Sequence, residues 1–302
     1  MEYLTSYSNF LKKHLKVSRS LKVVCDSSNG TTGFVLKKVF EKNPNIKLIL
    51  INDKPDGNFP AHGPNPLSPG ALDQTVEKVL KEKADFGAIF DADGDRVFFI
   101  DDKGQLLSSF ISAIFLFKNS KPPFVADETS YQALKIIRAF SKKNLRPSKV
   151  GYPFIRSKMK ESKASAAVEY SGHFYFKEFF GADSGIFAFI KMLNFISKSR
   201  TCLSQFVRKQ PNLFVELEQI EIESELNYWE NRVKDYFLKH NFKIENRDGI
   251  TAVSLWQFIN IRASNTEPLL RLTCGSKLKT DCKKAVADLK KILKLKNIRT
   301  VA

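Results

Sequence analysis

The sequence predicts an α/β protein made of successive domains, and three observations support this. Short apolar segments typical of strands alternate with amphipathic segments typical of helices over most of the chain. Such alternation indicates a mainly parallel sheet with helices on its faces. The chain has 302 residues, a length that accommodates about two or three domains. Polar or proline-containing segments at 119–123 and 197–204 mark candidate boundaries between them.

The first region is expected to start with a helix within residues 1–20, where most apolar residues are spaced at three to four positions. The next expected elements are a strand at 21–25, a helix at about 34–41, a strand at 46–51 and a helix at about 70–83. A polar segment, Asp26 to Gly33, joins the first strand to its helix. Backbone amides there could bind a phosphate, but the segment lacks the Lys and Gly spacing of a P-loop, so a structural turn is the favoured interpretation.

A second α/β cycle follows the boundary at 119–123. Its expected elements are a strand at 124–126, a helix around 131–143, a strand near Lys149 and a helix around 185–198. A third region of strands and helices runs from Pro211 to Ala302. We therefore expect a leading helix at 1–20 and domains at 21–120, 121–205 and 206–302.

Composition argues against several classes of protein. Hydrophobic residues make up 43% of the chain, as in ordinary globular proteins, and no apolar stretch reaches the ~20 residues that a membrane span requires. The amino terminus lacks the pattern of a secretory signal, so we expect a cytoplasmic protein that does not associate with a membrane. The four cysteines are widely scattered and there are only four histidines, which argues against a zinc site.

The formal net charge is +17, which is compatible with nucleic acid, an acidic membrane or anionic small substrates as partners. The lysines are spread along the chain in short runs, and no nucleic-acid-binding motif is present. We therefore expect no nucleic-acid partner. A positive field would instead concentrate anions such as sugar phosphates.

The segment from Asp91 to Arg96 is the most informative part of the chain. Asp91, Asp93 and Asp95 alternate with small residues between two apolar runs, 86–90 and 97–100. Alternate residues of an extended chain point to the same side, so the three carboxylates can converge on one hard cation. Carboxylate oxygens suit Mg²⁺, which keeps open positions for water or a phosphoryl oxygen. The pattern predicts a magnesium site at a strand end.

Three other interpretations compete with a magnesium site. An acidic turn on a solvated surface is the simplest of them. An EF-hand loop also begins with Asp at its first, third and fifth positions, but here the sixth position is Arg96 rather than Gly and the flanks are typical of strands. A phosphatase that uses the first Asp of an Asp-x-Asp loop as nucleophile is compatible with this segment alone.

Two further segments carry polar groups suited to a phosphorylated sugar. The segment from Glu169 to His173 presents a carboxylate, a hydroxyl and an imidazole, which can bind sugar hydroxyls, although a histidine beside aromatic residues is more often structural. The segment from Arg262 to Pro268 follows an apolar run and combines a guanidinium with hydroxyls and an amide. Those groups suit a phosphate dianion, and an ordinary polar turn is the alternative.

The order of these three segments resembles the α-D-phosphohexomutase family, the phosphoglucomutases and phosphomannomutases. Supporting stretches that look similar are 26–33, 55–60, 150–159 and 248–250. The resemblance runs from about residue 21 to residue 275 and favours a mutase over a phosphatase or an EF-hand. It implies successive mixed-sheet α/β domains followed by a smaller α+β C-terminal domain.

The resemblance also implies a role for each candidate residue. The metal-binding domain would hold Mg²⁺ through the three Asp residues, with Arg96 closing the loop. The sugar-binding domain would contact the substrate through Glu169, Ser171 and His173, and His173 could also move a proton. The phosphate-binding domain would use Arg262, Ser264, Asn265 and Thr266. Arg156 stands where relatives often have Lys, and a guanidinium cannot readily release a proton, so phosphate or hydroxyl binding suits it better than acid/base catalysis.

One family feature is absent from the sequence. Relatives carry a phosphorylated Ser directly before a His in a first domain, and no Ser in this chain directly precedes a His. The chain resembles domains two to four without that first domain. We therefore expect a component of a phosphohexomutase, an enzyme that transfers a phosphoryl group between the 1- and 6-positions of a hexose phosphate. Its phosphoserine domain would be separately encoded or lost. A non-catalytic phosphosugar-binding relative is the alternative.

Overall fold

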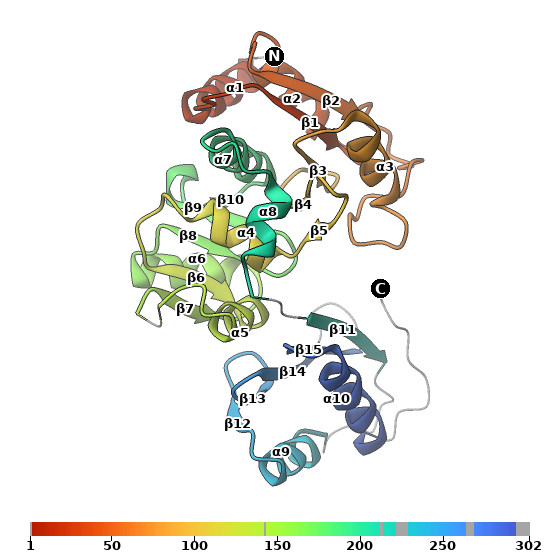
Figure 1. Ribbon diagram of the computed structural model, residues 1–302. Coiled ribbons are helices and arrows are strands. Elements are labelled where there is room, and N and C mark those ends of the chain that lie inside the picture. The colour runs from red at the N-terminus through yellow and green to blue at the C-terminus, as the bar shows by residue number, and fades with distance from the viewer. Residues whose placement is uncertain (1, 142, 212–213, 222–228, 264–268, 294–302) are drawn as a thin grey trace. The chain divides into compact units, whose positions relative to one another are not determined.

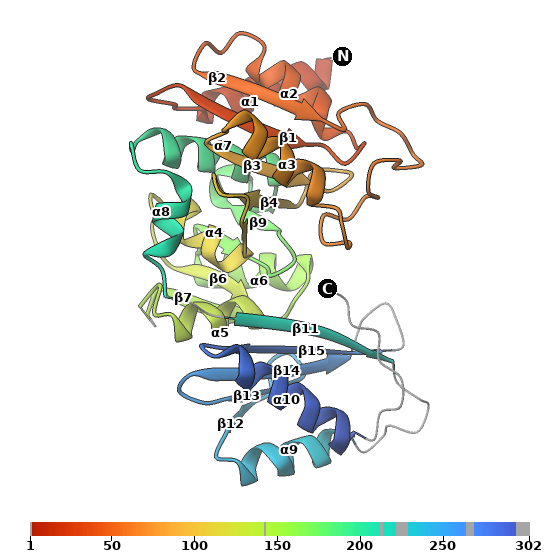
Figure 2. The ribbon, with the colours of Figure 1, turned by 45° about the vertical axis from the view of Figure 1, so that its right-hand side comes forward.

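The computed structural model shown in Figures 1 and 2 describes residues 2–141, 143–211, 214–221, 229–263 and 269–293. The chain forms two compact units. The first unit contains residues 1–124 and 159–210, and the second contains residues 125–158 and 211–302. In the part of the chain that the structure describes, no helix is long and apolar enough to cross a membrane.

The first unit contains a five-stranded sheet whose order is β2 (Ile46–Ile51), β1 (Leu21–Asp26), β3 (Phe86–Phe90), β4 (Val97–Ile100) and β5 (Leu106–Leu107). The three strands β2, β1 and β3 are parallel, whereas β4 and β5 are antiparallel to their neighbours. The sheet is therefore mixed rather than wholly parallel. The reason is the short acidic loop after β3, which returns the chain directly as β4 and leaves no room for a crossover helix.

Helices cover both faces of this sheet. They are α1 (Glu2–His14), α2 (Thr32–Phe40), α3 (Asp73–Glu82) and, from later in the chain, α7 (Gly185–Ser197). On one face, Val79 of α3 packs with Val24 and Ile100, and Figure 2 shows α3 lying across β1 and β3. On the other face, Phe189 of α7 contacts Phe86 and Phe90. Burial on both faces explains why these strands are almost wholly apolar in sequence.

Three more strands of the first unit, β10 (Ala182–Asp183), β9 (Phe174–Phe176) and β8 (Ala166–Val168), pair antiparallel. The helices α4 (Ser109–Leu116) and α8 (Leu203–Arg208) belong to the same unit. The second unit contains most of β6 (Phe124–Asp127), α5 (Glu128–Ile136), β7 (Leu145–Ser148) and the start of α6 (Tyr152–Ser162).

One sequence expectation in this region was wrong in its limits. The helix expected at 131–143 ends at Ile136, and Arg138 follows with a left-handed backbone, φ 55°. The strand expected near Lys149 is confirmed as β7, which ends at Ser148. Left-handed geometry cannot continue an α-helix, so the polar residues after Ile136 form a turn rather than another helical turn.

The C-terminal part of the second unit is a five-stranded antiparallel sheet of order β11 (Phe214–Glu221), β15 (Leu269–Ser276), β14 (Gln257–Ala263), β13 (Ile250–Val253) and β12 (Lys243–Glu245). Two helices, α9 (Trp229–Lys239) and α10 (Lys279–Ile292), pack their apolar residues into the same core as the strands. The expected fold class is therefore confirmed: mixed α/β sheets precede a smaller α+β region.

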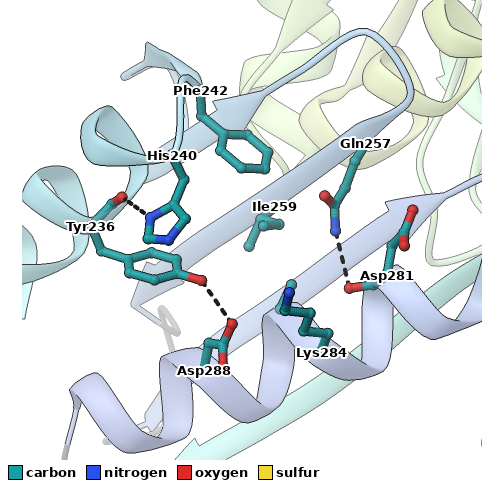
Figure 3. A pocket seen from close by; sticks show the side chains of 9 residues that line it. Tyr236, His240, Phe242, Gln257, Ile259, Asp281, Lys284 and Asp288 are labelled. Carbon is teal, nitrogen blue, oxygen red and sulfur yellow. Dashed lines mark hydrogen bonds between the residues drawn. The ribbon is translucent and has the colours of Figure 1, made fainter.

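The two helices of this region are also joined by a polar contact. Figure 3 shows the ring of Tyr236 in α9 directed toward Asp288 in α10, beside a hollow of about 350 Å³. The Tyr236 hydroxyl donates a hydrogen bond of 2.9 Å to the Asp288 carboxylate. Burial, and then this carboxylate, raises the pKa of Tyr236 to about 12. The hydroxyl therefore stays protonated and the contact persists across the neutral range.

Candidate functional site

The acidic loop between β3 and β4 brings Asp91, Asp93 and Asp95 together. Each offers a carboxylate oxygen within 4.8 Å of the others, in the arrangement of a metal site. Asp91 is buried, whereas Asp93 is exposed. Three oxygen donors with one face open to solvent fit Mg²⁺, which retains water ligands when proteins bind it.

Asp91 is the structural anchor of this loop. One of its carboxylate oxygens accepts hydrogen bonds of 3.1 Å from the backbone N–H groups of Gly94 and Arg96. The other accepts a hydrogen bond of 2.6 Å from the Arg96 Nε. Burial and then the neighbouring Asp95 raise the pKa of Asp91, Arg96 lowers it, and the net result is a pKa of about 6. Crowded carboxylates of this kind are stabilised by a bound cation.

The segment from Glu169 to His173 is connected to the acidic loop through backbone and side chains. The Val97 N–H donates to the Gly172 carbonyl at 3.2 Å. The imidazole Nε2 of His173 is 3.5 Å from an Asp95 carboxylate oxygen, and its Nδ1 is 2.8 Å from the Ser171 hydroxyl. Burial lowers the pKa of His173, but Asp95 and Glu169 raise it more, so the net shift is upward. This environment favours an imidazole that carries a proton.

The other residues of this segment differ in their surroundings. Glu169 is buried, and its carboxylate accepts a hydrogen bond of 2.6 Å from the Tyr175 hydroxyl while lying 3.7 Å from the Nδ1 of His173. Glu169 is thus placed behind the imidazole in this structure, where it can set the orientation and charge of His173. Ser171 is half-buried, and its hydroxyl is the partner of the His173 Nδ1.

The sequence pattern did not indicate three residues that the structure adds to the site. Asp183 offers a carboxylate oxygen within 4.8 Å of Asp95 and His173 ligand atoms, and burial raises its pKa. Tyr175 supports Glu169, and Asn65 accepts a hydrogen bond of 3.4 Å from the Arg96 guanidinium. Each of these three residues lies outside the sequence motif that contains the residue it contacts. The acidic loop and Asp183 share a hollow of about 270 Å³.

The loop at 26–33 packs against the backbone of the acidic loop and is hydrogen-bonded to it. The Thr31 N–H donates to the Ala92 carbonyl at 3.0 Å, and the Ser28 hydroxyl donates to the Phe90 carbonyl at 2.5 Å. Gly30 lies against the Ala92 backbone so closely that a Cβ there would come within 2.0 Å of the Ala92 oxygen. The interpretation of this loop as a structural turn agrees with these contacts, and the glycine is required by the close approach.

A buried carboxylate holds the start of that loop. Asp26 is 0% exposed and has four polar partners from four places in the sequence. It accepts hydrogen bonds from the Ser28 N–H at 2.9 Å, the Asn52 amide at 3.0 Å and the Thr75 hydroxyl at 2.9 Å. The fourth partner, His62, has its Nε2 at 3.2 Å from the same carboxylate. The network fixes the loop relative to β1, β2 and α3.

The remaining candidate residues lie in the second unit. The Arg156 guanidinium is exposed on α6 and donates a hydrogen bond of 2.9 Å to the Tyr152 hydroxyl. Arg262 is at the end of β14, and its Nε is 3.8 Å from a carboxylate oxygen of Asp248. Ser264, Asn265 and Thr266 lie outside the described residues. Of the four residues expected to bind phosphate in this segment, the structure therefore describes Arg262 alone.

Comparison with known sequences identifies the family. Residues 1–104 match domain II, and residues 105–214 match domain III, of phosphoglucomutase/phosphomannomutase, both described as alpha/beta/alpha domains. A phosphomannomutase of Escherichia coli K12 is 32% identical over 291 residues, which are 92% of this chain and 62% of that protein. A phosphomannomutase of Methanocaldococcus jannaschii is 31% identical over 297 residues, 96% of this chain and 65% of that protein.

Solved structures show the same fold. A phosphoglucomutase/phosphomannomutase family protein from Burkholderia thailandensis superimposes with a TM-score of 0.84 at 24% identity, covering 96% of this chain and 64% of that one. An N-acetylphosphoglucosamine mutase of Aspergillus fumigatus, in complex with GlcNAc-6P and magnesium, gives a TM-score of 0.65 at 14% identity, covering 96% and 68%. The chain belongs to the phosphoglucomutase/phosphomannomutase family, and it spans less than two thirds of the length of the two phosphomannomutases.

Proposed function

We propose that the chain is the metal-, sugar- and phosphate-binding part of a phosphohexomutase, which moves a phosphoryl group between the 1- and 6-positions of a hexose phosphate. One observation carries the proposal: the acidic loop and His173 lie together in one unit, with the His173 Nε2 at 3.5 Å from Asp95. A cation site beside an imidazole suits phosphoryl transfer, in which negative charge moves between oxygens. The related structure with GlcNAc-6P and magnesium supports this choice of ligand and metal.

In this proposal each group of residues has a defined task. Asp91, Asp93 and Asp95 hold Mg²⁺, which neutralises charge on the phosphoryl group when it is bound. Arg96 keeps Asp91 in place through its hydrogen bond. His173 and Ser171 bind sugar hydroxyls, and Glu169 maintains the charge of the imidazole from its buried position.

The second unit would hold the phosphate that does not react. Arg262 contacts it, aided by Ser264, Asn265 and Thr266, and Arg156 adds a second cation.

The proposed domains are those expected from the sequence, at 21–120, 121–205 and 206–302, after the helix at 1–20. A phosphoserine from outside residues 1–302 donates its phosphoryl group to the free sugar hydroxyl, and the serine oxygen released in that step then accepts the other phosphoryl group of the sugar bisphosphate. The alternative, a phosphosugar-binding protein without catalysis, uses the same residues and differs in turnover alone.

We expect Asp93→Asn to weaken Mg²⁺ binding by about tenfold or more, because one of three charged ligands is lost. Asp93 is exposed, so the fold should tolerate the substitution. Isothermal titration calorimetry of the full chain with MgCl₂ measures the effect. Asp73→Asn, which removes an equally exposed charge from the first turn of α3, is the matched control. Equal Mg²⁺ affinity in Asp93→Asn and wild type would contradict the metal assignment.

We expect Arg262→Ala to weaken binding of glucose 6-phosphate by about 2–3 kcal/mol, the free energy of a hydrogen bond to a charged group. The exposed Arg232 of α9 provides the control, since Arg232→Ala removes the same charge from the same region. Calorimetric titration with the sugar phosphate gives both affinities. If wild type and Arg262→Ala bind it equally well, Arg262 does not bind the substrate phosphate.

A further inference from the structure

The turn between β12 and β13 carries two charged residues that make contacts in different directions. Arg247 contacts residues of α5, and Asp248 contacts Arg262 and the backbone before α6. The stretch 248–250 is part of the sequence resemblance described above, but the proposed function gives it no task. All of these residues belong to the second unit, so their contacts describe one compact body.

Arg247 anchors the turn to α5. Its guanidinium donates two hydrogen bonds to the Glu128 carboxylate, at 2.9 and 3.1 Å, and another to Glu245. Glu128 is buried, and the Tyr131 ring lies 5.3 Å from the guanidinium. Paired hydrogen bonds to a buried carboxylate restrict an arginine in both distance and direction. The turn is therefore held firmly on the first turn of α5.

Asp248 is fixed by its backbone as well as by its side chain. Its carbonyl accepts a hydrogen bond of 2.7 Å from the amide of Asn260, which is 2% exposed. Gly249 follows with φ 69°, and a Cβ at that position would lie 2.2 Å from the Ile261 oxygen. Only glycine permits this conformation and this close approach to β14. The carboxylate of Asp248 thus has a defined position beside the end of β14.

That carboxylate lies between two parts of the proposed phosphate site. It accepts a hydrogen bond of 3.2 Å from the Val150 N–H, immediately before Gly151 and helix α6, which carries Arg156. It is also 3.8 Å from the Nε of Arg262. The two side chains are only 16% and 15% exposed. A partly buried pair is screened less by solvent than an exposed one, so Asp248 can restrict the Arg262 guanidinium.

We propose that Asp248 is a positioning residue for phosphate binding: it orders the Arg262 guanidinium before the substrate arrives and links it to the backbone at Val150. The inference rests on the proposed role of Arg262. Ordering an arginine in advance lowers the entropy that phosphate binding must remove. The negative charge of Asp248 by itself would repel a phosphate dianion, so the positioning effect and the simple charge effect have opposite signs.

Asp248→Asn separates the two effects. The amide keeps an oxygen for the Val150 N–H and removes the charge that faces Arg262. We expect about fivefold to tenfold weaker binding of glucose 6-phosphate by calorimetry, as expected when an ordered side chain becomes free. Asp235→Asn, at an exposed position of α9, removes the same charge from the same region and should leave the affinity unchanged. Stronger or unchanged binding by Asp248→Asn would overturn the proposal.

A second readout needs no substrate. The Nε–H resonance of Arg262 in a ¹H–¹⁵N NMR spectrum, assigned by its loss in Arg262→Lys, should shift and exchange faster with water in Asp248→Asn. Asp248→Glu keeps the charge and moves it by one methylene, so it should also shift this resonance while leaving the melting curve of Trp229 and Trp256 fluorescence unchanged. A wild-type resonance in both variants would overturn the positioning role. If Arg262→Ala itself leaves glucose 6-phosphate binding unchanged, the proposed function fails instead.

Discussion

Asp26→Ala is expected to destabilise the first unit by about 3–5 kcal/mol, because a buried carboxylate and its partners act as one network. The substitution leaves the donors of Ser28, Asn52 and Thr75 without their common acceptor, and it leaves the His62 imidazole buried without a counter-charge. Each unsatisfied buried donor costs about 1–3 kcal/mol, although water entering the space left by the carboxylate would recover part of this. The loss should appear first in β1 and the loop at 26–33.

Hydrogen exchange measured by mass spectrometry can locate this effect. Peptides from β1 and β3 should lose protection in Asp26→Ala. Both tryptophans of the chain, Trp229 and Trp256, lie in the second unit, so their fluorescence transition in urea should stay close to that of wild type. A uniform loss of protection in both units would mean that the chain unfolds as one cooperative body. Unchanged protection of β1 would show that the network contributes little.

His62→Gln tests the charged part of the same network. The hydrogen bond with Asp26 raises the pKa of His62, and burial opposes it. A raised folded-state pKa means that the stabilising charge is fully present below the unfolded value of about 6.5 and is lost as the pH rises through the folded value. The difference in protection between wild type and His62→Gln should therefore be larger at pH 6 than at pH 8.5.

The parts of the site that could be predicted from the sequence are those encoded by local spacing. Asp91, Asp93 and Asp95 alternate along an extended chain, and the structure brings their carboxylates together. The continuous apolar runs on either side, 86–90 and 97–100, are also a local signal, and they predicted buried strands. Contacts between segments that are distant in the sequence are not encoded by local spacing. The partners of Asp26 come from residues 28, 52, 62 and 75, and their convergence depends on how β1, β2 and α3 pack together.

The surroundings of Glu169, which is expected to contact sugar hydroxyls, also depend on more than local spacing. It stands beside Ser171 and His173 in the sequence, but β9 brings the Tyr175 hydroxyl to its carboxylate and buries both. A pattern of residue types cannot show which member of a polar cluster faces inward. The helix that ends early at Ile136 is a similar case, since the left-handed turn at Arg138 is set by the return of the chain into β7.

The largest expected effect on activity is the restoration of mutase turnover by a phosphoserine domain added in trans. The 302-residue chain alone should convert glucose 1-phosphate to glucose 6-phosphate slower than the reconstituted mixture by on the order of 10³-fold or more, even with Mg²⁺ and glucose 1,6-bisphosphate. No Ser in the sequence directly precedes a His, and the three Asp residues are proposed to hold the metal rather than attack phosphorus. The acidic loop opens on a hollow lined by Tyr7 and Thr31, where the phosphoserine loop would enter.

The added component would be the phosphorylated first domain of a bacterial phosphomannomutase, and its Ser→Ala form is the matched control. A coupled assay for glucose 6-phosphate should detect turnover with the phosphorylated domain and none with the Ser→Ala form. Turnover should be reduced at limiting Mg²⁺ when the chain carries Asp93→Asn. Binding of glucose 6-phosphate to the chain alone should be retained, because the groups that contact the sugar and its phosphate are already present. Turnover by the purified chain alone would require a nucleophile within residues 1–302 and would contradict the prediction. Binding without turnover in any mixture would favour the non-catalytic alternative, since nucleophile, metal and sugar sites would then all be present without transfer.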